Sequence, residues 1–317
     1  MLTHGLIETF EDHPPSSDSD DFMGRLRLQQ VDRDVFTGWC HAGSPLRAFG
    51  GQVAAQALVA AGATVEDEAR EVHSLHAYFL RPGRTTDHIV YMVDRPRDGR
   101  TFSTRRVRAI QYGETIFALS ASFAGPQGGP RHQRRGVPPL WWSEVPAPDD
   151  LPPERVFDHI RMPTDAESEP RREVLQRAGY PTHQLFDLRV IPPPDALALS
   201  RGGFDRMVWV RSMQDLSGGQ LPNVCALTYF SDLNMVGTVL GQHGGRSSAG
   251  AYEVASLDHA MWFHNAFRSD DWMLFATDSP ASGGGRGYAR GEFYRTDGVL
   301  AASTAQEVLV REPRAKG

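Results

Sequence analysis

The first half of the chain combines one apolar helix with several alternating segments. The run 50–61 opens with two glycines, is rich in alanine and carries no charge, so it is predicted as a helix that ends near Gly62. A helix so poor in charge is expected to be buried. The segments after it alternate apolar and polar residues and predict strands that wrap around the helix as an antiparallel meander. These segments are 72–80, 88–94, 101–111 and 115–123, and a short strand is expected before the helix at 31–39.

The second half repeats this plan. An apolar run at 227–240 is predicted as a helix that opens around Ser231 and Asp232. The sequence Thr296-Asp297-Gly298 is a hairpin signal between the last two alternating segments. The predicted strands of this half are 186–190, 207–210, 255–263, 272–277, 286–295 and 299–310.

The two halves also resemble one another in detail. His76 and His259 lie in related apolar runs. The length of chain between the turn glycines Gly113 and Gly298 is nearly the same as that between these two histidines. A separation of more than half the chain exceeds the roughly 20–50 residues of a solenoid repeat. We therefore interpret the chain as a duplicated domain, in which the chemistry can be kept in one copy or lie across the seam.

The composition of the remaining segments sets the domain boundaries. Residues 1–24 are acidic and polar, with too little apolar surface to offset ordering, and are expected to form a flexible tail. Residues 126–183 are rich in Pro, Arg and acids and are expected to connect the halves, with a short helix at 171–177. The two folded units are thus expected at 25–125 and 184–311, followed by a short tail at 312–317.

Composition and charge narrow the function classes. The 317 residues carry a formal charge of −6, which offers no general attraction to nucleic acid or an anionic membrane. No secretory signal and no apolar run of membrane-spanning length is seen, so a cytoplasmic protein is expected. Cys40 and Cys225 have no metal-ligand spacing, and the only lysine, Lys316, excludes a Walker-type loop and Schiff-base chemistry. We expect neither a metal nor a cofactor.

Seven motifs in the two halves are similar to those of the type II acyl-CoA thioesterases (the TesB type). The resemblance covers roughly residues 25–125 and 184–311 and leaves out the tail and the connector. It implies an α+β double hotdog fold, in which each half has a long helix wrapped by an antiparallel sheet, and it implies homodimers or homotetramers. The matching segments are 49–52, 72–83, 98–107, 231–234, 257–264, 290–300 and 302–307.

The resemblance also implies a catalytic trio. The family has an Asp at the start of the second helix, a Thr on the following strand and a Gln on the last strand. These positions fall on Asp232, Ser256 and Gln306, so a serine stands where the family has threonine. The serine keeps the hydroxyl but loses the methyl group that restricts χ1.

The trio has the groups that thioester hydrolysis requires. A carboxylate can take a proton from water, a hydroxyl and an amide can orient that water, and backbone N–H groups at a helix start can stabilise the oxyanion. Each residue also has a simpler interpretation. Asp232 can be a helix N-cap, Ser256 a strand hydroxyl and Gln306 a solvent-facing residue. Asp258 and His259 invite comparison with a Ser-His-Asp triad, but no G-x-S-x-G elbow occurs and neighbouring strand residues face opposite sides.

The first half lacks the acid. Counting from the repeat, Gly51 corresponds to Asp232 and Ser122 to Gln306, so we expect one active site per chain, built from second-half residues. Substrate binding is assigned to Gly50, Gly51 and His259. Arg81, Arg84, Arg105 and Arg106 are candidate partners of coenzyme A phosphates, although a solvated or cross-strand-paired arginine is at least as good an interpretation.

The predicted function is therefore hydrolysis of fatty acyl-CoA to fatty acid and free coenzyme A. Two alternatives remain open at this stage. One is a hotdog hydratase or dehydratase acting on enoyl-CoA, which would need an Asp-His pair, yet no histidine follows Asp232 before His243. The other is a catalytically degenerate hotdog that binds acyl-CoA or a partner protein, an alternative that Ser256 makes more credible.

Overall fold

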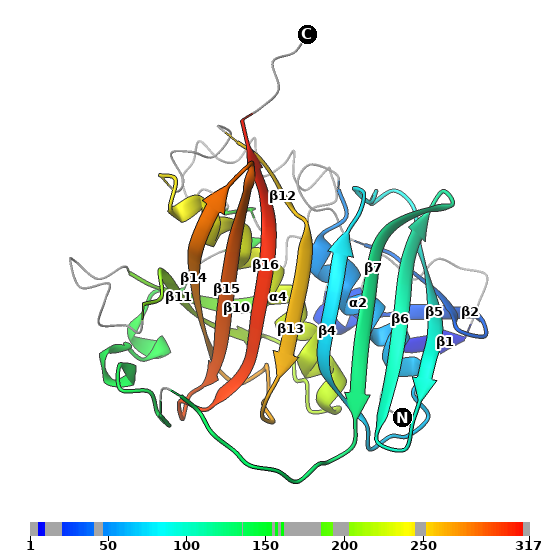
Figure 1. Ribbon diagram of the computed structural model, residues 1–317, viewed down its shortest axis with the longest axis horizontal. Coiled ribbons are helices and arrows are strands. Elements are labelled where there is room, and N and C mark those ends of the chain that lie inside the picture. The colour runs from blue at the N-terminus through cyan, green and yellow to red at the C-terminus, as the bar shows by residue number, and fades with distance from the viewer. Residues whose placement is uncertain are drawn as a thin grey trace.

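A computed structural model of the chain describes most of both halves (Figure 1). The described residues are 6–9, 21–40, 47–134, 136–153, 156–157, 160–161, 185–192, 203–244 and 252–312. The short helix expected at 171–177 lies outside them.

The first half follows the predicted meander. Helix α2 (Gly50–Ala63) is followed by four antiparallel strands, and the expected strand at 31–39 is a hairpin of two strands that turns at Asp34, where φ is 59°. The strands are β2 (Leu28–Asp32), β3 (Val35–Gly38), β4 (Glu71–Phe79), β5 (Ile89–Asp98), β6 (Phe102–Gln111) and β7 (Glu114–Ala124).

The second half contains α4 (Gln220–Gly241) and a second antiparallel set of strands. The segment expected as one strand at 255–263 is divided at Leu257 into two. The strands are β10 (Phe186–Ile191), β11 (Arg206–Ser212), β12 (Glu253–Ser256), β13 (Asp258–Phe263), β14 (Met273–Gly283), β15 (Arg286–Arg295) and β16 (Leu300–Arg311).

The two halves join into one 14-stranded sheet. Its order is β1-β2-β3-β5-β6-β7-β4-β13-β16-β15-β14-β11-β10, with β12 also pairing with β16. The seam is the antiparallel pair β4–β13, in which Leu75 lies opposite Met261, and β4 and β13 run side by side in Figure 1. Helices α2 and α4 lie together on one side of the sheet and pack against each other. This is the predicted double hotdog.

Apolar helices explain this packing. Twelve residues of α2, from Gly51 to Gly62, are buried, and most of them are alanine, glycine or valine. Small side chains allow α2 to approach α4 closely: a Cβ on Gly51 would lie 2.5 Å from the backbone oxygen of Tyr229. The core is therefore continuous across the seam rather than divided between two separate domains.

The predicted start of the second helix was wrong. Helix α4 begins at Gln220 and not near Ser231, so Asp232 lies in the helix interior and is not an N-cap. Pro222 does not stop the helix because it lies in the first turn, where the missing N–H would have no intrahelical partner. The side chain of Asn223 donates to the backbone oxygens of Leu216 and Gly219 and fixes this end.

The helix α4 also bears on the membrane prediction. We found no run of spanning length in the sequence, yet α4 is long and apolar enough to cross a membrane by length and composition. In this fold it is the core helix of the second half, and 72% of its most apolar window is buried inside the protein. Its hydropathy thus has a sufficient explanation in the core.

Parts of the expected tail and connector are folded. Strand β1 (Ile7–Thr9) pairs in parallel with β2, and helix α1 (Phe22–Leu26) begins at the N-cap Asp21, so residues 1–24 are not flexible throughout. The Phe22 ring packs on Phe186 and Tyr229 of the second half. The connector includes the 3₁₀ turns η1 (Trp142–Glu144) and η2 (Pro148–Asp150) and the short paired strands β8 (Val156–Phe157) and β9 (Ile160–Arg161).

The residue-by-residue match between halves was wrong at two positions. His259 is buried and faces the helices, whereas His76 is exposed on the other face of the sheet, so aligning these two histidines exchanges the faces. Likewise Gln306 points toward the helices, while Ser122 points away and bonds to His73. Counted from the hairpin glycines, Ala121, which is buried, corresponds to Gln306.

Candidate active site

Asp232, Ser256 and Gln306 meet in the structure, as the sequence predicted. The hydroxyl of Ser256 donates to Asp232 Oδ1 at 2.8 Å. The amide nitrogen of Gln306 donates to the same oxygen at 3.1 Å and to Ser256 Oγ at 2.8 Å. Asp232 and Gln306 are 8% and 1% exposed, so this network lies at the edge of the core. The three side chains form a closed triangle of hydrogen bonds around one carboxylate oxygen.

Each member is held by a different element. Asp232 lies in the interior of α4, where the helix backbone fixes its direction. Ser256 is the last residue of β12 and lies opposite Val308 of β16. Gln306 is an inward-facing residue of β16, two positions before Val308. The break at Leu257, whose N–H donates to Glu307 O, places Ser256 next to the amide of Gln306.

The second carboxylate oxygen of Asp232 faces the other half of the molecule. A Cβ on Gly50, the first residue of α2, would lie 2.8 Å from Asp232 Oδ2 and 2.6 Å from the ring of Phe79. No described residue donates a hydrogen bond to Oδ2, nor accepts one from the N–H groups of Gly50 and Gly51. These N–H groups belong to the first turn, where no intrahelical partner exists and the helix dipole favours negative charge.

The helix start beside Asp232 is therefore that of α2, and not that of the second-half helix, as we expected. The sequence could not show this, because the approach depends on the packing of the two halves. The signal was the pair Gly50-Gly51, since a side chain at either position would collide with the neighbouring half.

His259 lies directly behind the trio. Its Nδ1 is 2.6 Å from the amide oxygen of Gln306, and its Nε2 is 2.8 Å from Ser231 Oγ. Burial lowers the pKa of His259 and so favours the neutral ring, although Asp232, Gln306 and Asp258 act in the opposite direction. We assigned His259 to substrate binding; the structure places it against Gln306 instead. Ser231 lies within the matching segment 231–234, but the sequence does not show its contact with His259.

Asp258 takes no part in this network. It faces the opposite side of the sheet and its carboxylate accepts the backbone N–H of Glu307 at 2.6 Å. Neighbouring residues of a strand point to opposite faces, as we predicted when we rejected a Ser-His-Asp triad.

The four predicted arginines lie in different places. Arg105 is 1% exposed and bonds Asp98 and the hydroxyl and carbonyl of Thr64, which caps the C-terminal end of α2. It is thus at the far end of α2 from Gly50, about 20 Å away by the rise of a 14-residue helix. Arg106 is exposed on the face of the sheet away from the helices. Neither position favours contact with a substrate at Asp232.

Arg81 lies nearer to the start of α2. It follows β4, and the backbone oxygen of Gly83, two residues further on, accepts the backbone N–H of Ala48, which precedes α2. Its half-exposed guanidinium pairs with Glu114 at 2.9 Å. Arg84, close by in the same loop, stacks on the ring of Tyr112 at 5.2 Å.

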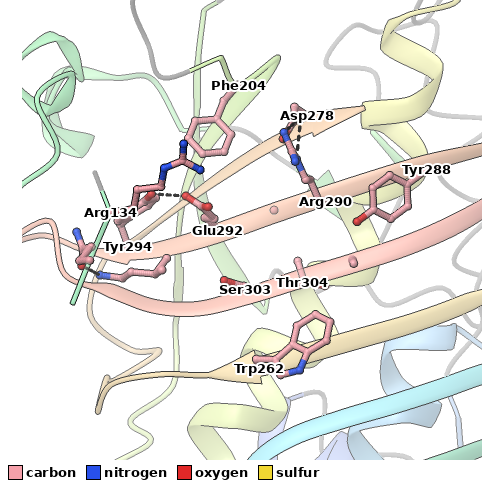
Figure 2. A pocket seen from close by; sticks show the side chains of 14 residues that line it. Arg134, Phe204, Trp262, Asp278, Tyr288, Arg290, Glu292, Tyr294, Ser303 and Thr304 are labelled. Carbon is pink, nitrogen blue, oxygen red and sulfur yellow. Dashed lines mark hydrogen bonds and ion pairs between the residues drawn. The ribbon is translucent and has the colours of Figure 1, made fainter. Parts of the chain in front are cut away.

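A groove of about 420 Å³ lies on the opposite face of the second half (Figure 2). Figure 2 shows Trp262 of β13 and Tyr288, Arg290 and Glu292 of β15 around it, on either side of β16, with Phe204 at its side. Because the sheet separates this groove from Asp232, it is not the space in which the trio acts. Among the residues that the structure describes, no group of three His, Cys, Asp or Glu side chains could hold a metal ion.

Comparison with known proteins shows the family of the chain. The family model "Acyl-CoA thioesterase" matches residues 195–309, and the model of the acyl-CoA thioesterase N-terminal domain matches 37–124. Acyl-coenzyme A thioesterase 8 of Mus musculus is 36% identical over an alignment of 294 residues that covers 90% of this chain and 87% of the mouse protein. The chain belongs to the acyl-CoA thioesterase family.

Two further relatives place it among the TesB-like enzymes. Acyl-CoA thioesterase 2 of Haemophilus influenzae is 34% identical and covers 90% of this chain and 95% of its own length. The crystal structure of acyl-CoA thioesterase II TesB2 from Mycobacterium marinum superposes with a TM-score of 0.72 at 36% identity, covering 92% of this chain and 98% of that one. The protein is thus a TesB-like type II thioesterase and a thioester hydrolase.

Proposed function

We propose that this thioesterase hydrolyses fatty acyl-CoA by activating a water molecule on Asp232 Oδ2. The observation that supports the proposal is that the two oxygens of the Asp232 carboxylate have different surroundings. Oδ1 accepts from Ser256 and Gln306, which fix the plane of the carboxylate, and Oδ2 faces the start of α2. A water bound there lies between a proton acceptor and the N–H groups of a helix N-terminus.

The steps of the reaction follow from this arrangement. The water oxygen attacks the thioester carbonyl carbon while its proton passes to Oδ2. The carbonyl oxygen becomes an oxyanion, which the N–H groups of Gly50 and Gly51 stabilise. The carbonyl then re-forms, the C–S bond breaks and the coenzyme A thiolate leaves with the electron pair. The proton held on Asp232 passes to the thiolate or to solvent, which restores the carboxylate.

Ser256 supports the same role as a threonine would. Its hydroxyl already donates to Asp232 and accepts from Gln306, so the hydrogen bonds that the trio needs are made without the extra methyl group. A catalytically degenerate binding protein would not need this complete set of hydrogen bonds.

Contacts with the coenzyme A phosphates are proposed at Arg81 and Arg84. Both lie in the loop that contacts the segment before α2, and an arginine fork matches the geometry of a phosphate. Arg105 and Arg106 are not included, because one is buried at the other end of α2 and the other lies across the sheet.

The hydratase alternative is not favoured by the described residues. His243 follows the end of α4 and its ring contacts Ser282 Oγ at 3.1 Å, while His259 contacts Gln306 and Ser231 rather than the acid. The Asp-His pair that such chemistry would use is therefore not formed by these side chains.

The deciding experiment measures free thiol released from palmitoyl-CoA by wild type and Asp232→Asn with a thiol reagent. The protein's own thiols interfere little, because Cys40 and Cys225 are buried and burial raises the pKa of Cys225 far above its ordinary value. Turnover by wild type with loss in Asp232→Asn supports the proposal. An Asp232→Asn enzyme with wild-type turnover contradicts the mechanism, and a wild type without turnover on any fatty acyl-CoA contradicts the substrate class.

A further inference from the structure

Gln306 can act only if its amide has one particular orientation. The carboxylate of Asp232 is an acceptor, so the amide nitrogen must face it for the contact at 3.1 Å to be a hydrogen bond. The same nitrogen also donates to Ser256 at 2.8 Å. Turning the amide over would exchange its two ends and place its oxygen against the carboxylate and the serine. The amide oxygen must then face His259.

This orientation fixes the proton on His259. The amide oxygen of Gln306 can only accept, so the 2.6 Å contact requires a proton on Nδ1 of the ring. Because burial favours the neutral ring by lowering its pKa, a proton on Nδ1 leaves Nε2 as the acceptor for Ser231 Oγ at 2.8 Å. The Ser231 hydroxyl is also 2.9 Å from the backbone oxygen of Thr228. The hydroxyl has one proton, so when it donates to the ring the Thr228 oxygen keeps only the helical N–H of Asp232 as its donor.

We propose that His259 is a positioning residue that holds the Gln306 amide toward Asp232 through the chain Ser231–His259–Gln306. The inference rests on the proposed function, because it concerns the same trio. Ser231 and Asp232 are neighbours on α4. The series of hydrogen bonds therefore starts and ends on one helix, and it passes through His259 of β13 and Gln306 of β16. Ser231, His259 and Gln306 are each at most 1% exposed, so water does not compete for these hydrogen bonds.

A matched pair of substitutions separates positioning from packing. In His259→Asn the amide nitrogen can take the place of Nδ1 and donate to Gln306. In His259→Gln the longer side chain carries its amide to the place of Nε2, near Ser231, and the donor to Gln306 is lost. We expect kcat on palmitoyl-CoA to stay within about fivefold of wild type in His259→Asn. In His259→Gln it should fall by about 100-fold, with KM within about twofold, because a misplaced catalytic group costs rate rather than binding.

A double-mutant cycle checks the path of the effect. If His259 acts through Gln306, His259→Gln should lower kcat little further in a Gln306→Ala enzyme, and the two effects should not add. Equal kcat values for His259→Asn and His259→Gln, or additive effects with Gln306→Ala, would overturn the proposal. Asp232→Asn is measured in parallel. If Asp232→Asn is inactive while His259→Gln is fully active, the positioning role of His259 is refuted and the proposed mechanism stands. If Asp232→Asn is active, the proposed mechanism itself fails.

A measurement on the unmodified protein does not depend on the variants folding. The ¹⁵N chemical shifts of His259 in labelled wild-type enzyme should show a neutral ring with the proton on Nδ1 at pH 7.5. A ring protonated on Nε2 alone, or an imidazolium, would place the wrong atom against Gln306 and would refute the inference.

Discussion

Asp232 of the second half and Gly50 of the first half are in direct contact. The absent side chain of Gly50 leaves Asp232 Oδ2 at the first turn of α2, where a Cβ would lie 2.8 Å from this oxygen. The acid and the helix start thus come from opposite halves, although the trio itself lies in the second half. The pseudo-equivalent positions in the first half, Gly51 and Ala121, carry no acid and no amide, which supports the proposal of one site per chain.

Removing the base should abolish most of the turnover. Asp232→Asn keeps the shape of the side chain but cannot take a proton, so kcat should fall by about 10²–10⁴. Because Asp232 lies inside α4 and is no N-cap, the melting temperature should change little.

Asp258→Asn is the matched control for this substitution. Asp258 is close in sequence and on the adjoining strand, but it faces the other side of the sheet, and asparagine can still accept the Glu307 N–H. Its kcat should stay within about twofold of wild type. A loss as large as that of Asp232→Asn would mean that negative charge in this region, rather than the base, is required.

Filling the gap at Gly50 should also impair catalysis. In Gly50→Ala the new methyl group would lie 2.8 Å from Asp232 Oδ2 and 2.6 Å from Phe79, so the carboxylate or the helix start must move. We expect kcat to fall by about 100-fold in a folded protein, since a shift of about 1 Å is enough for such a loss.

Gly62→Ala tests whether any alanine in α2 would do the same. Its methyl group would meet the end of the flexible Leu221 side chain at 2.8 Å, at the opposite end of the helix. Near-normal turnover is expected. If instead Gly50→Ala is fully active and folded, the start of α2 does not form the oxyanion site.

Burial of His259 predicts a loss of stability in acid. Burial lowers the pKa of this ring, so the unfolded chain takes up a proton near its ordinary pKa of about 6.5 while the folded protein does not. The contribution of His259 to stability is therefore complete above pH 6.5 and is lost as the pH falls below it. His73 and His264, whose pKa values are also lowered by burial, add to this trend.

Chemical denaturation at pH 7.5 and 5.5 measures the effect. Wild type should lose unfolding free energy between the two values, and His259→Asn should lose less, because asparagine does not titrate. An equal loss in both proteins would show that the folded protein accommodates a charged His259.

The serine in the trio should be sufficient for activity. Ser256→Ala removes the donor to Asp232 Oδ1 and one of the two acceptors of the Gln306 amide, which keeps Asp232 Oδ1. The net loss is about one hydrogen bond, so we expect kcat to fall by about tenfold. Ser256→Thr restores the family residue and should retain or raise kcat, because the methyl group restricts the rotamers. Steady-state kinetics on palmitoyl-CoA compares the two. An alanine enzyme as active as wild type would remove this hydroxyl from the mechanism.

The residues that the sequence could and could not place differ in a physical way. Alternation predicted the strands that follow α2, and the motifs predicted that Asp232, Ser256 and Gln306 would meet. The start of α4 was missed because Pro222 is harmless in a first helical turn. The match of Ser122 to Gln306 failed because a shift of one residue exchanges the faces of a strand. The approach of Gly50 to Asp232 depends on how the halves pack and leaves no local pattern.

Removing the side-chain amide of Gln306 tests its role in the trio, and Ser122→Ala, a substitution on the opposite face of the sheet, is the control. Gln306→Ala removes the donor to Asp232 and Ser256 and leaves the Nδ1 proton of His259 without its acceptor, so kcat should fall by about 100-fold. Ser122→Ala should leave kcat within about twofold, because Ser122 bonds His73 on the opposite face of the sheet and touches no member of the trio. Both enzymes should be compared at equal folded concentration, judged by circular dichroism. If Ser122→Ala were the more harmful, the chemistry would have to lie on that other face, and a single site at Asp232 would no longer describe the enzyme.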